Sequence, residues 1–230
     1  RNRKAVLQSE FKNENLMKAD AKIDLTVEIP KRLRVKIDDG SGSIFVTDMA
    51  SNLKIADGSG SIEIRVTAGP VSISDGSGKI EVTDITGNLE VKDGSGEINI
   101  ARVRGNVRIV DGSGSMTIKD IDGSLTVTDG SGSIEAQEIA GNVTIDDGSG
   151  SITVRQIQGG VLINDGSGST AKDSTAHGHD ASITGAKWVP SQAPGRNRML
   201  MTSSSGSRLP GIGRPRRRSA PAAHPHMDPG

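Results

Sequence analysis

The tetrapeptide Asp-Gly-Ser-Gly recurs every 18 residues and dominates this sequence. Its eight copies begin, with no insertion or deletion between them, at Asp39, Asp57, Asp75, Asp93, Asp111, Asp129, Asp147 and Asp165. A fixed period of this kind is typical of repeat architectures, in which each unit packs mainly against its neighbours. We therefore expect a stack in which residues 18 apart occupy equivalent positions.

Each repeat divides into two halves of nine residues, and each half contains an apolar–polar–apolar triplet. The repeat at 75–92, DGSGKIEVT followed by DITGNLEVK, carries Ile80 and Val82 in one half and Leu89 and Val91 in the other. Alternation of branched aliphatic residues predicts a short strand with one buried face. A third apolar residue follows at the second turn of most repeats, with Thr67 as the exception.

These observations predict an all-β fold, a single-stranded parallel β-helix (β-solenoid) with two short strands per 18-residue rung. Strands from the same half of successive repeats run in the same direction, so the sheets are parallel, and the crossover rule predicts a right-handed coil. The chain has only three aromatic residues and no cysteine. The core must therefore consist of Ile, Val and Leu, and disulfides and thiolate metal sites are excluded.

Three segments are predicted. Residues 1–20 form a polar N-terminal segment, and residues 21–169 form the solenoid, with lead-in strands within 21–38 that cap its first rung. Residues 170–230 are predicted to be a disordered basic tail rich in Pro, Ser, Gly and Arg, because Thr170 and Lys172 stand where core aliphatics belong. The chain begins at Arg1 rather than Met, so we expect a fragment or a processed form, in which a missing signal peptide carries no information.

The Asp-Gly-Ser-Gly row has two interpretations. In the favoured one it is a row of tight turns, because Asp accepts hydrogen bonds from nearby backbone N–H groups and Gly adopts positive φ. In the alternative it is a calcium ladder formed by Asp39, Asp57, Asp75, Asp93, Asp111, Asp129 and Asp147. Calcium-binding β-rolls also use nine-residue halves, but their motif places the Asp after the glycines. Stacked carboxylates repel one another, so they must be solvated, hydrogen-bonded or bridged by cations.

The repeats, together with the lead-in VEIPKRLRVKIDDGSGSI (27–44), resemble the bacterial putative-adhesin domain family. The resemblance covers about residues 21–169. It implies a β-helical protein of the cell envelope, periplasm or cell exterior with a structural or binding role, and it brings no catalytic residues.

Other chemistries find little support in the sequence. No repeat has a long loop that could build an enzyme cleft, so a carbohydrate-active enzyme is disfavoured. The four histidines and the basic cluster at 214–219 all lie in the predicted tail, which indicates neither a metal site nor a specific nucleic-acid interface. No apolar run is long enough to span a membrane. We therefore expect a non-enzymatic rod without cofactors that makes multivalent contacts with an envelope polysaccharide or a surface protein.

Overall fold

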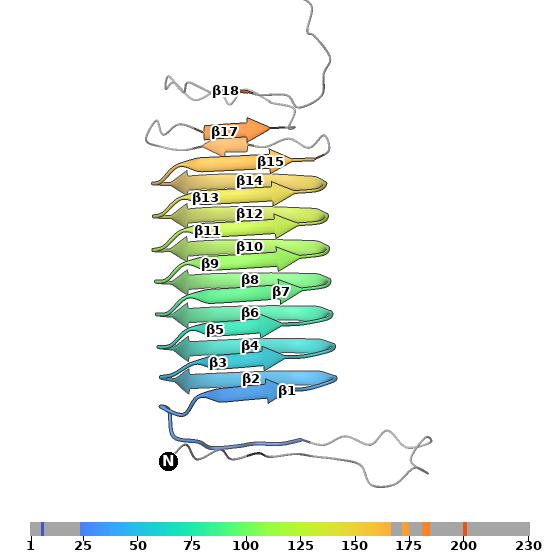
Figure 1. The fold of residues 1–230 in the computed structure, drawn as a ribbon, viewed down its shortest axis with the longest axis vertical. Coiled ribbons are helices and arrows are strands. Elements are labelled where there is room, and N and C mark those ends of the chain that lie inside the picture. The colour runs from blue at the N-terminus through green and yellow to red at the C-terminus, as the bar shows by residue number, and fades with distance from the viewer. Residues whose placement is uncertain (1–5, 7–23, 167–171, 175–180, 185–199, 202–230) are drawn as a thin grey trace, which may run out of the picture.

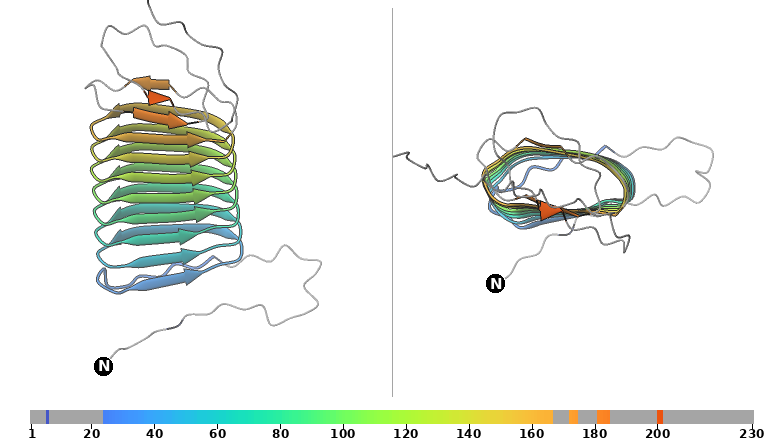
Figure 2. Two further views of the ribbon diagram at one scale, coloured as in Figure 1. Left: turned by 45° about the horizontal axis from the view of Figure 1, so that its top comes forward. Right: turned by 90° about the horizontal axis from the view of Figure 1, so that it is seen from above.

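A computed structural model describes residue 6 and residues 24–166, 172–174, 181–184 and 200–201. The described chain is all-β and contains no helix, as predicted (Figure 1). Its strands coil into a β-solenoid of about seven turns whose two parallel sheets face each other across a flattened core (Figure 2). The right-handed sense of the coil stays a prediction.

The odd-numbered strands form one sheet, which β18 extends to ten strands. The even-numbered strands β2 to β16 form the other sheet, of eight strands. The ten-stranded sheet contains β1 (Val35–Asp38), β3 (Leu53–Ala56), β5 (Val71–Ser74), β7 (Leu89–Asp93), β9 (Val107–Asp111), β11 (Leu125–Asp129), β13 (Val143–Asp147), β15 (Val161–Asp165), β17 (Ala181–Thr184) and β18 (Leu200–Met201). The eight-stranded sheet contains β2 (Gly42–Met49), β4 (Gly60–Thr67), β6 (Gly78–Ile85), β8 (Gly96–Val103), β10 (Gly114–Ile121), β12 (Gly132–Ile139), β14 (Gly150–Ile157) and β16 (Lys172–Ser174).

The register between neighbouring strands equals the sequence period through β15. Ile80 pairs with Ile98 in one sheet and Leu89 with Val107 in the other, each 18 residues apart. The predicted triplet positions are buried along the stack, with Ile80 and Val82 fully inaccessible to solvent. The core is therefore a continuous column of stacked aliphatic side chains.

The seven even-numbered strands from β2 to β14 are longer than predicted, because the expected second turn lies inside them. One residue near the end of each has positive φ, as Asp120 does at 58°, and the ladder skips this residue. The break in alternation turns the next residue inward, so Ile121 joins Met116 and Ile118 in the core. This geometry explains the third apolar residue of each repeat.

The N-terminal end differs from the prediction. The lead-in strand expected within 32–38 is confirmed as β1, but residues 24–30 form no strand. Their alternating aliphatics Leu25, Val27 and Ile29 stay exposed, and Pro30 adjoins a turn in which Leu33 N–H donates to the Pro30 carbonyl. The prediction of a capping strand at 21–30 is therefore wrong for the described residues 24–30, since alternation alone supplies no hydrogen-bonding partner.

The period also changes at the C-terminal end. Lys172 pairs with Thr153 and Ala181 with Val161, at separations of 19 and 20 residues. Lys172 is thus aligned with Thr153 rather than with core Val154, which corrects its predicted core position. Strands β16, β17 and β18 lie within the segment for which a disordered tail was predicted, and the rest of that segment, including Thr170, lies outside the described residues.

Candidate functional site

The corner formed by Asp-Gly-Ser-Gly leaves no room for side chains at its glycines. Gly114 has φ of 146°, and a Cβ built on it would overlap the carbonyl oxygen of Gly96 in the preceding rung. A Cβ on the first glycine of a motif meets the same obstacle, at 2.6 Å from the Gly40 carbonyl oxygen in the case of Gly58. From the second motif onward, successive rungs therefore touch through bare backbone at this corner, which requires glycine there.

The Asp of each of the first seven motifs accepts hydrogen bonds from the turn that follows it. Asp57 Oδ1 accepts from Gly58 N–H at 2.8 Å, and Asp111 Oδ1 accepts from Ser113 N–H at 3.3 Å. The same pattern holds in the first motif, where Gly40 N–H donates to Asp39 Oδ1 at 2.8 Å. One carboxylate oxygen therefore stabilises the turn, as the turn interpretation of this motif predicts.

The Asp side chains point into the solenoid from the second motif onward. Asp39 is exposed, whereas Asp111 is 5% exposed and Asp147 only 2%. The second carboxylate oxygen has neither solvent contact nor a hydrogen-bond partner in Asp57, Asp75, Asp93, Asp111, Asp129 and Asp147. Such an oxygen is costly to bury as part of an ion.

Burial changes the acidity of these groups. Removal of the charged form from solvent, together with the negative charge of neighbouring Asp111, raises the pKa of Asp93 to about 6. Desolvation and the same neighbour raise the pKa of Asp129 to about 6 as well. Desolvation also raises the pKa of Asp75, Asp111 and Asp147 above the ordinary value for aspartate.

The calcium alternative finds no preformed cage in the described part of the chain. No group of three or more His, Asp or Glu side chains converges there as metal ligands would. Calcium takes six to eight oxygen ligands, whereas each buried Asp here directs one oxygen to its own turn. The absence of bound calcium stays a prediction.

The opposite corner, formed by the positive-φ residues of the even strands, is exposed and variable. Its column reads Asp48, Val66, Asp84, Arg102, Asp120, Glu138 and Gln156. Arg102 forms a two-pronged ion pair with Asp84 of the preceding rung, with Nε–Oδ1 at 2.6 Å and Nη2–Oδ2 at 2.9 Å. The hydrogen bond from Arg102 lowers the pKa of Asp84. Mixed charges in such a column indicate a solvated surface.

The pair Val66–Thr67 reverses the pattern of this corner. Other rungs place a polar residue at the exposed position and an aliphatic residue at the buried one, whereas Val66 is 51% exposed and Thr67 is 1% exposed. Thr67 Oγ1 has no hydrogen-bond partner. Val66 has φ of 55°, which a β-branched residue rarely adopts. This rung is therefore locally strained.

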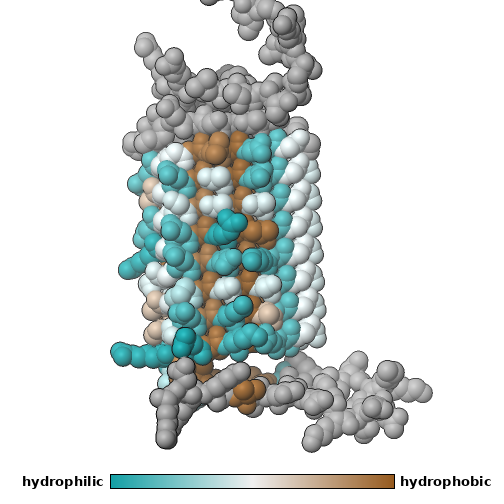
Figure 3. Space-filling view, in the orientation of Figure 1, coloured by the Kyte–Doolittle hydropathy of each residue, from teal (hydrophilic) through white to brown (hydrophobic). Residues whose placement is uncertain are grey.

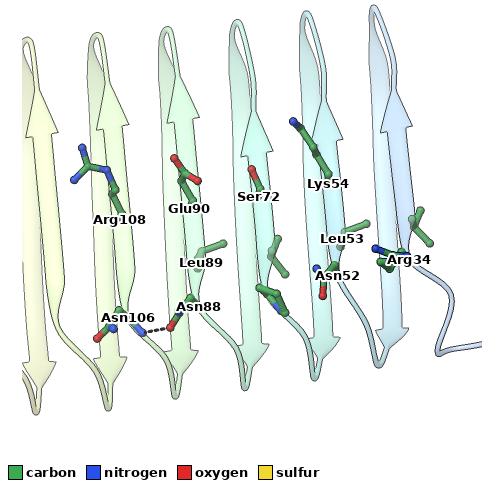
Figure 4. A pocket seen from close by; sticks show the side chains of 13 residues that line it. Arg34, Asn52, Leu53, Lys54, Ser72, Asn88, Leu89, Glu90, Asn106 and Arg108 are labelled. Atoms are coloured by element: carbon green, nitrogen blue, oxygen red, sulfur yellow. Dashed lines mark hydrogen bonds between the residues drawn. The ribbon is translucent and has the colours of Figure 1, made fainter.

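A shallow groove of about 610 Å³ runs along the outer face of the odd-numbered strands, across β1 to β9 (Figure 4). Two columns of polar side chains border it, one with Arg34, Asn52, Asn88 and Asn106 and the other with Lys54, Ser72, Glu90 and Arg108. Between these columns, strips of apolar surface are visible from outside (Figure 3). The groove therefore combines a partly apolar floor with polar rims.

Hydrogen bonds between rungs hold two asparagines of the groove, Asn88 and Asn106, in place. Asn106 N–H donates to Asn88 Oδ1 at 3.0 Å, and Ser124 N–H donates to Asn106 Oδ1 at 2.9 Å. Glu90 lies 3.5 Å from Lys92, so its charge is partly balanced. Arg34, Lys54 and Arg108 form no ion pair with another described residue.

The sequence identified the Asp-Gly-Ser-Gly corner, but two features were not predicted: the burial of its Asp side chains and the groove on the odd-numbered strands. The burial of the Asp row could have been found from the alternation Leu89, Val91, Asp93, which places the carboxyl on the inner face. The groove had a weaker signal, an Asn that occupies one position of the 18-residue repeat in several rungs but is replaced by Pro70 and Ser124 in two others. The predicted tail's histidines and basic cluster lie outside the described residues.

Comparison with known proteins places the chain in a family. The Toastrack DUF4097 family matches residues 5–206. The chain belongs to this family of domains of unknown function. No curated protein and no solved structure matched it. The matched region of this Toastrack domain includes the whole solenoid and extends past the predicted boundary at residue 169.

Among the residues that the structure describes, no helix is long and apolar enough to cross a membrane.

Proposed function

We propose that this Toastrack domain is a non-enzymatic structural and binding protein of the cell envelope or cell surface. It presents a rigid, repetitive face on which many weak contacts act together. The observation that carries the proposal is the groove, which crosses five rungs with the same 18-residue register and so offers equivalent positions in succession. Linked weak contacts raise avidity without a single strong site. The envelope location rests on the resemblance of the repeats to adhesin-type domains.

An acidic polysaccharide is the ligand that best fits this groove. Lys54 and Arg108 expose cationic groups that form no ion pair with a described carboxylate. Asn88 and Asn106, each held by a hydrogen bond to the next rung, add side-chain amide groups that can hydrogen-bond to hydroxyls. An extended polymer with a regular spacing of anionic groups can contact several rungs at once.

The groove is a poor setting for catalysis. Glu90 is the only carboxylate among its lining residues. Hydrolysis of a glycosidic bond ordinarily requires two carboxyl groups that flank the bond. The groove is also open along its length, so it does not exclude water from a reacting group. We therefore propose retention of a polysaccharide rather than its cleavage.

The test measures binding of the full chain to immobilised polysaccharides, one acidic (polygalacturonate) and one neutral (dextran). We expect retention on the acidic polymer only, with an affinity that falls as salt is raised. The double variant K54Q/R108Q should weaken binding about tenfold or more. Lys119→Gln, an exposed cation of β10 on the opposite sheet, is the matched control and should bind as the wild type does. Equal loss in the control, or no retention of the wild type, would overturn the proposal.

A further inference from the structure

The buried Asp row raises a question that the turn geometry leaves open. Each carboxyl directs Oδ1 to the N–H groups of its own turn, which accounts for half of its hydrogen-bonding capacity. The other oxygen, Oδ2, is out of contact with solvent and has no partner in Asp75, Asp93, Asp111, Asp129 and Asp147. An ionised carboxylate in this position would lack any compensation at Oδ2.

The repeat places these carboxyls directly above one another. Asp93, Asp111, Asp129 and Asp147 are Cα partners in adjacent parallel strands, which lie about 4.8 Å apart. Two carboxylates at this separation repel strongly once water is excluded. The turn that follows each Asp consists of Gly, Ser and Gly, which carry no charge that could offset the repulsion.

The charged groups around the row are nearly all carboxylates. Each member faces the Asp above and the Asp below, and Asp147 also adjoins Asp146 of its own strand. Asp57 and Asp165 continue the row at its two ends. The Ser that precedes an even-numbered strand donates its backbone N–H to the Asp of the same corner. Ser95, just before β8, donates in this way to Asp93 Oδ1. No Lys, Arg or His of the described chain is among the groups that act on these five carboxyls.

We propose that the solenoid binds protons along this row, so that the inner carboxyls of Asp75, Asp93, Asp111, Asp129 and Asp147 become neutral acids in mildly acidic solution and the fold is stabilised there. A proton bound to Oδ2 turns this oxygen into a hydrogen-bond donor. It can point along the stack to the next carboxyl, as side-chain amides do in ladders along parallel, in-register strands. The row is thus an acid-responsive column inside the fold, separate from the outer groove.

The direction of the pH effect follows from proton linkage. The pKa of Asp93 and Asp129 is raised to about 6, above the value of about 3.9 for an unfolded aspartate. The folded state therefore binds more protons than the unfolded state between these two values. Stability from this source is fully present below about pH 4 and is lost as the pH rises through about 6. Ordinary salt-bridged aspartates act in the opposite sense.

The first experiment compares thermal unfolding of the full chain at pH 5 and pH 8. We expect the Tm of the wild type to fall by roughly 5–10 °C between these pH values. The triple variant D93N/D111N/D129N should lose most of this fall, because Asn resembles the protonated acid in shape and places an N–H donor near the Oδ2 position. Asp39→Asn is the matched control, since Asp39 makes the same turn hydrogen bond but is exposed. The control should keep the wild-type fall.

The second experiment does not depend on the folding of a variant. Carboxyl ¹³C shifts of the aspartates in the wild-type protein are followed by NMR as the pH is changed. We expect a set of aspartates with midpoints near 6, distinct from the exposed ones. Midpoints below 4 for every aspartate would overturn the proposal. A wild type and triple variant with the same change in Tm from pH 5 to pH 8 would overturn it too.

Discussion

The two corners of the solenoid are built on opposite principles. The Asp-Gly-Ser-Gly corner repeats the same letters at every level, buries its Asp from the second rung onward and brings bare backbone into contact. The other corner holds Asp, Val, Arg, Glu or Gln at one positive-φ position and leaves it exposed. Sequence regularity in this fold therefore follows steric confinement. A corner position keeps the same residue where successive rungs touch through backbone, and it varies where its side chain faces water.

The largest expected effect comes from adding one methyl group to the confined corner. Gly114→Ala should cost more than ~4 kcal/mol, because its Cβ would overlap the Gly96 carbonyl and the backbone also has positive φ. Gly42→Ala, at the open first rung, has positive φ but no neighbouring atom closer than 3.8 Å, so it should cost only ~1–2 kcal/mol. Urea unfolding of both variants measures the difference. Equal costs would show that confinement is not the cause.

The fold can be stabilised at the variable corner where the polar and apolar positions are exchanged, at Val66 and Thr67. Thr67→Val removes a buried hydroxyl that has no partner and keeps the side-chain shape, so it should raise the free energy of unfolding by ~1–2 kcal/mol. Thr47→Val, at an exposed position of β2, should give no gain. Denaturant melts decide the matter, and a loss of stability in Thr67→Val would mean that the hydroxyl has a partner in solution.

A smaller gain in stability is expected at Val66, next to Thr67. Val66→Asn should stabilise the fold by ~1 kcal/mol, since Asn adopts positive φ more readily than a β-branched residue. Val66→Ile keeps the β-branch and should show no gain. If the two variants melt alike, backbone strain at Val66 is not the relevant quantity.

The smallest effect is expected at the exposed ion pair. Arg102→Gln introduces the residue that the same column carries as Gln156, and it should change the Tm by no more than ~2 °C because solvent screens the pair. The residual effect should shrink further at 1 M salt. A fall in Tm comparable to that of Gly114→Ala would contradict the distinction between the two corners.

Much of the fold followed from the sequence because its period equals its register. The strands and the inward triplets, such as Ile80 and Val82, were predicted by alternation and repetition alone, and the structure confirms them. The eight-residue length of the even-numbered strands was not predicted. One positive-φ residue in each of them breaks the alternation, and residues as different as Val66 and Arg102 occupy this position. The lack of a strand at 24–30 was missed for a different reason: alternation predicts strand propensity but does not supply a neighbouring strand.

The candidate sites were less predictable than the fold. The position of the Asp row was visible in the sequence, but its burial was not predicted, although the alternation of Leu89, Val91 and Asp93 indicates it. The groove arises from side chains on several rungs whose spacing becomes meaningful only after the chain has coiled. Thr67, noted as an exception to the core pattern, proved to be a buried hydroxyl.

The Asp-Gly-Ser-Gly row is a stack of turns held by hydrogen bonds to the protein's own backbone. Thermal unfolding of the full chain at neutral pH, in millimolar calcium and then in excess chelator, tests it most directly. We predict the same Tm in both, because one oxygen of each Asp is already bonded to its turn and no metal-binding cluster exists among the described residues. A large rise in Tm with calcium, lost in chelator, would contradict the account and show that the row is a metal ladder.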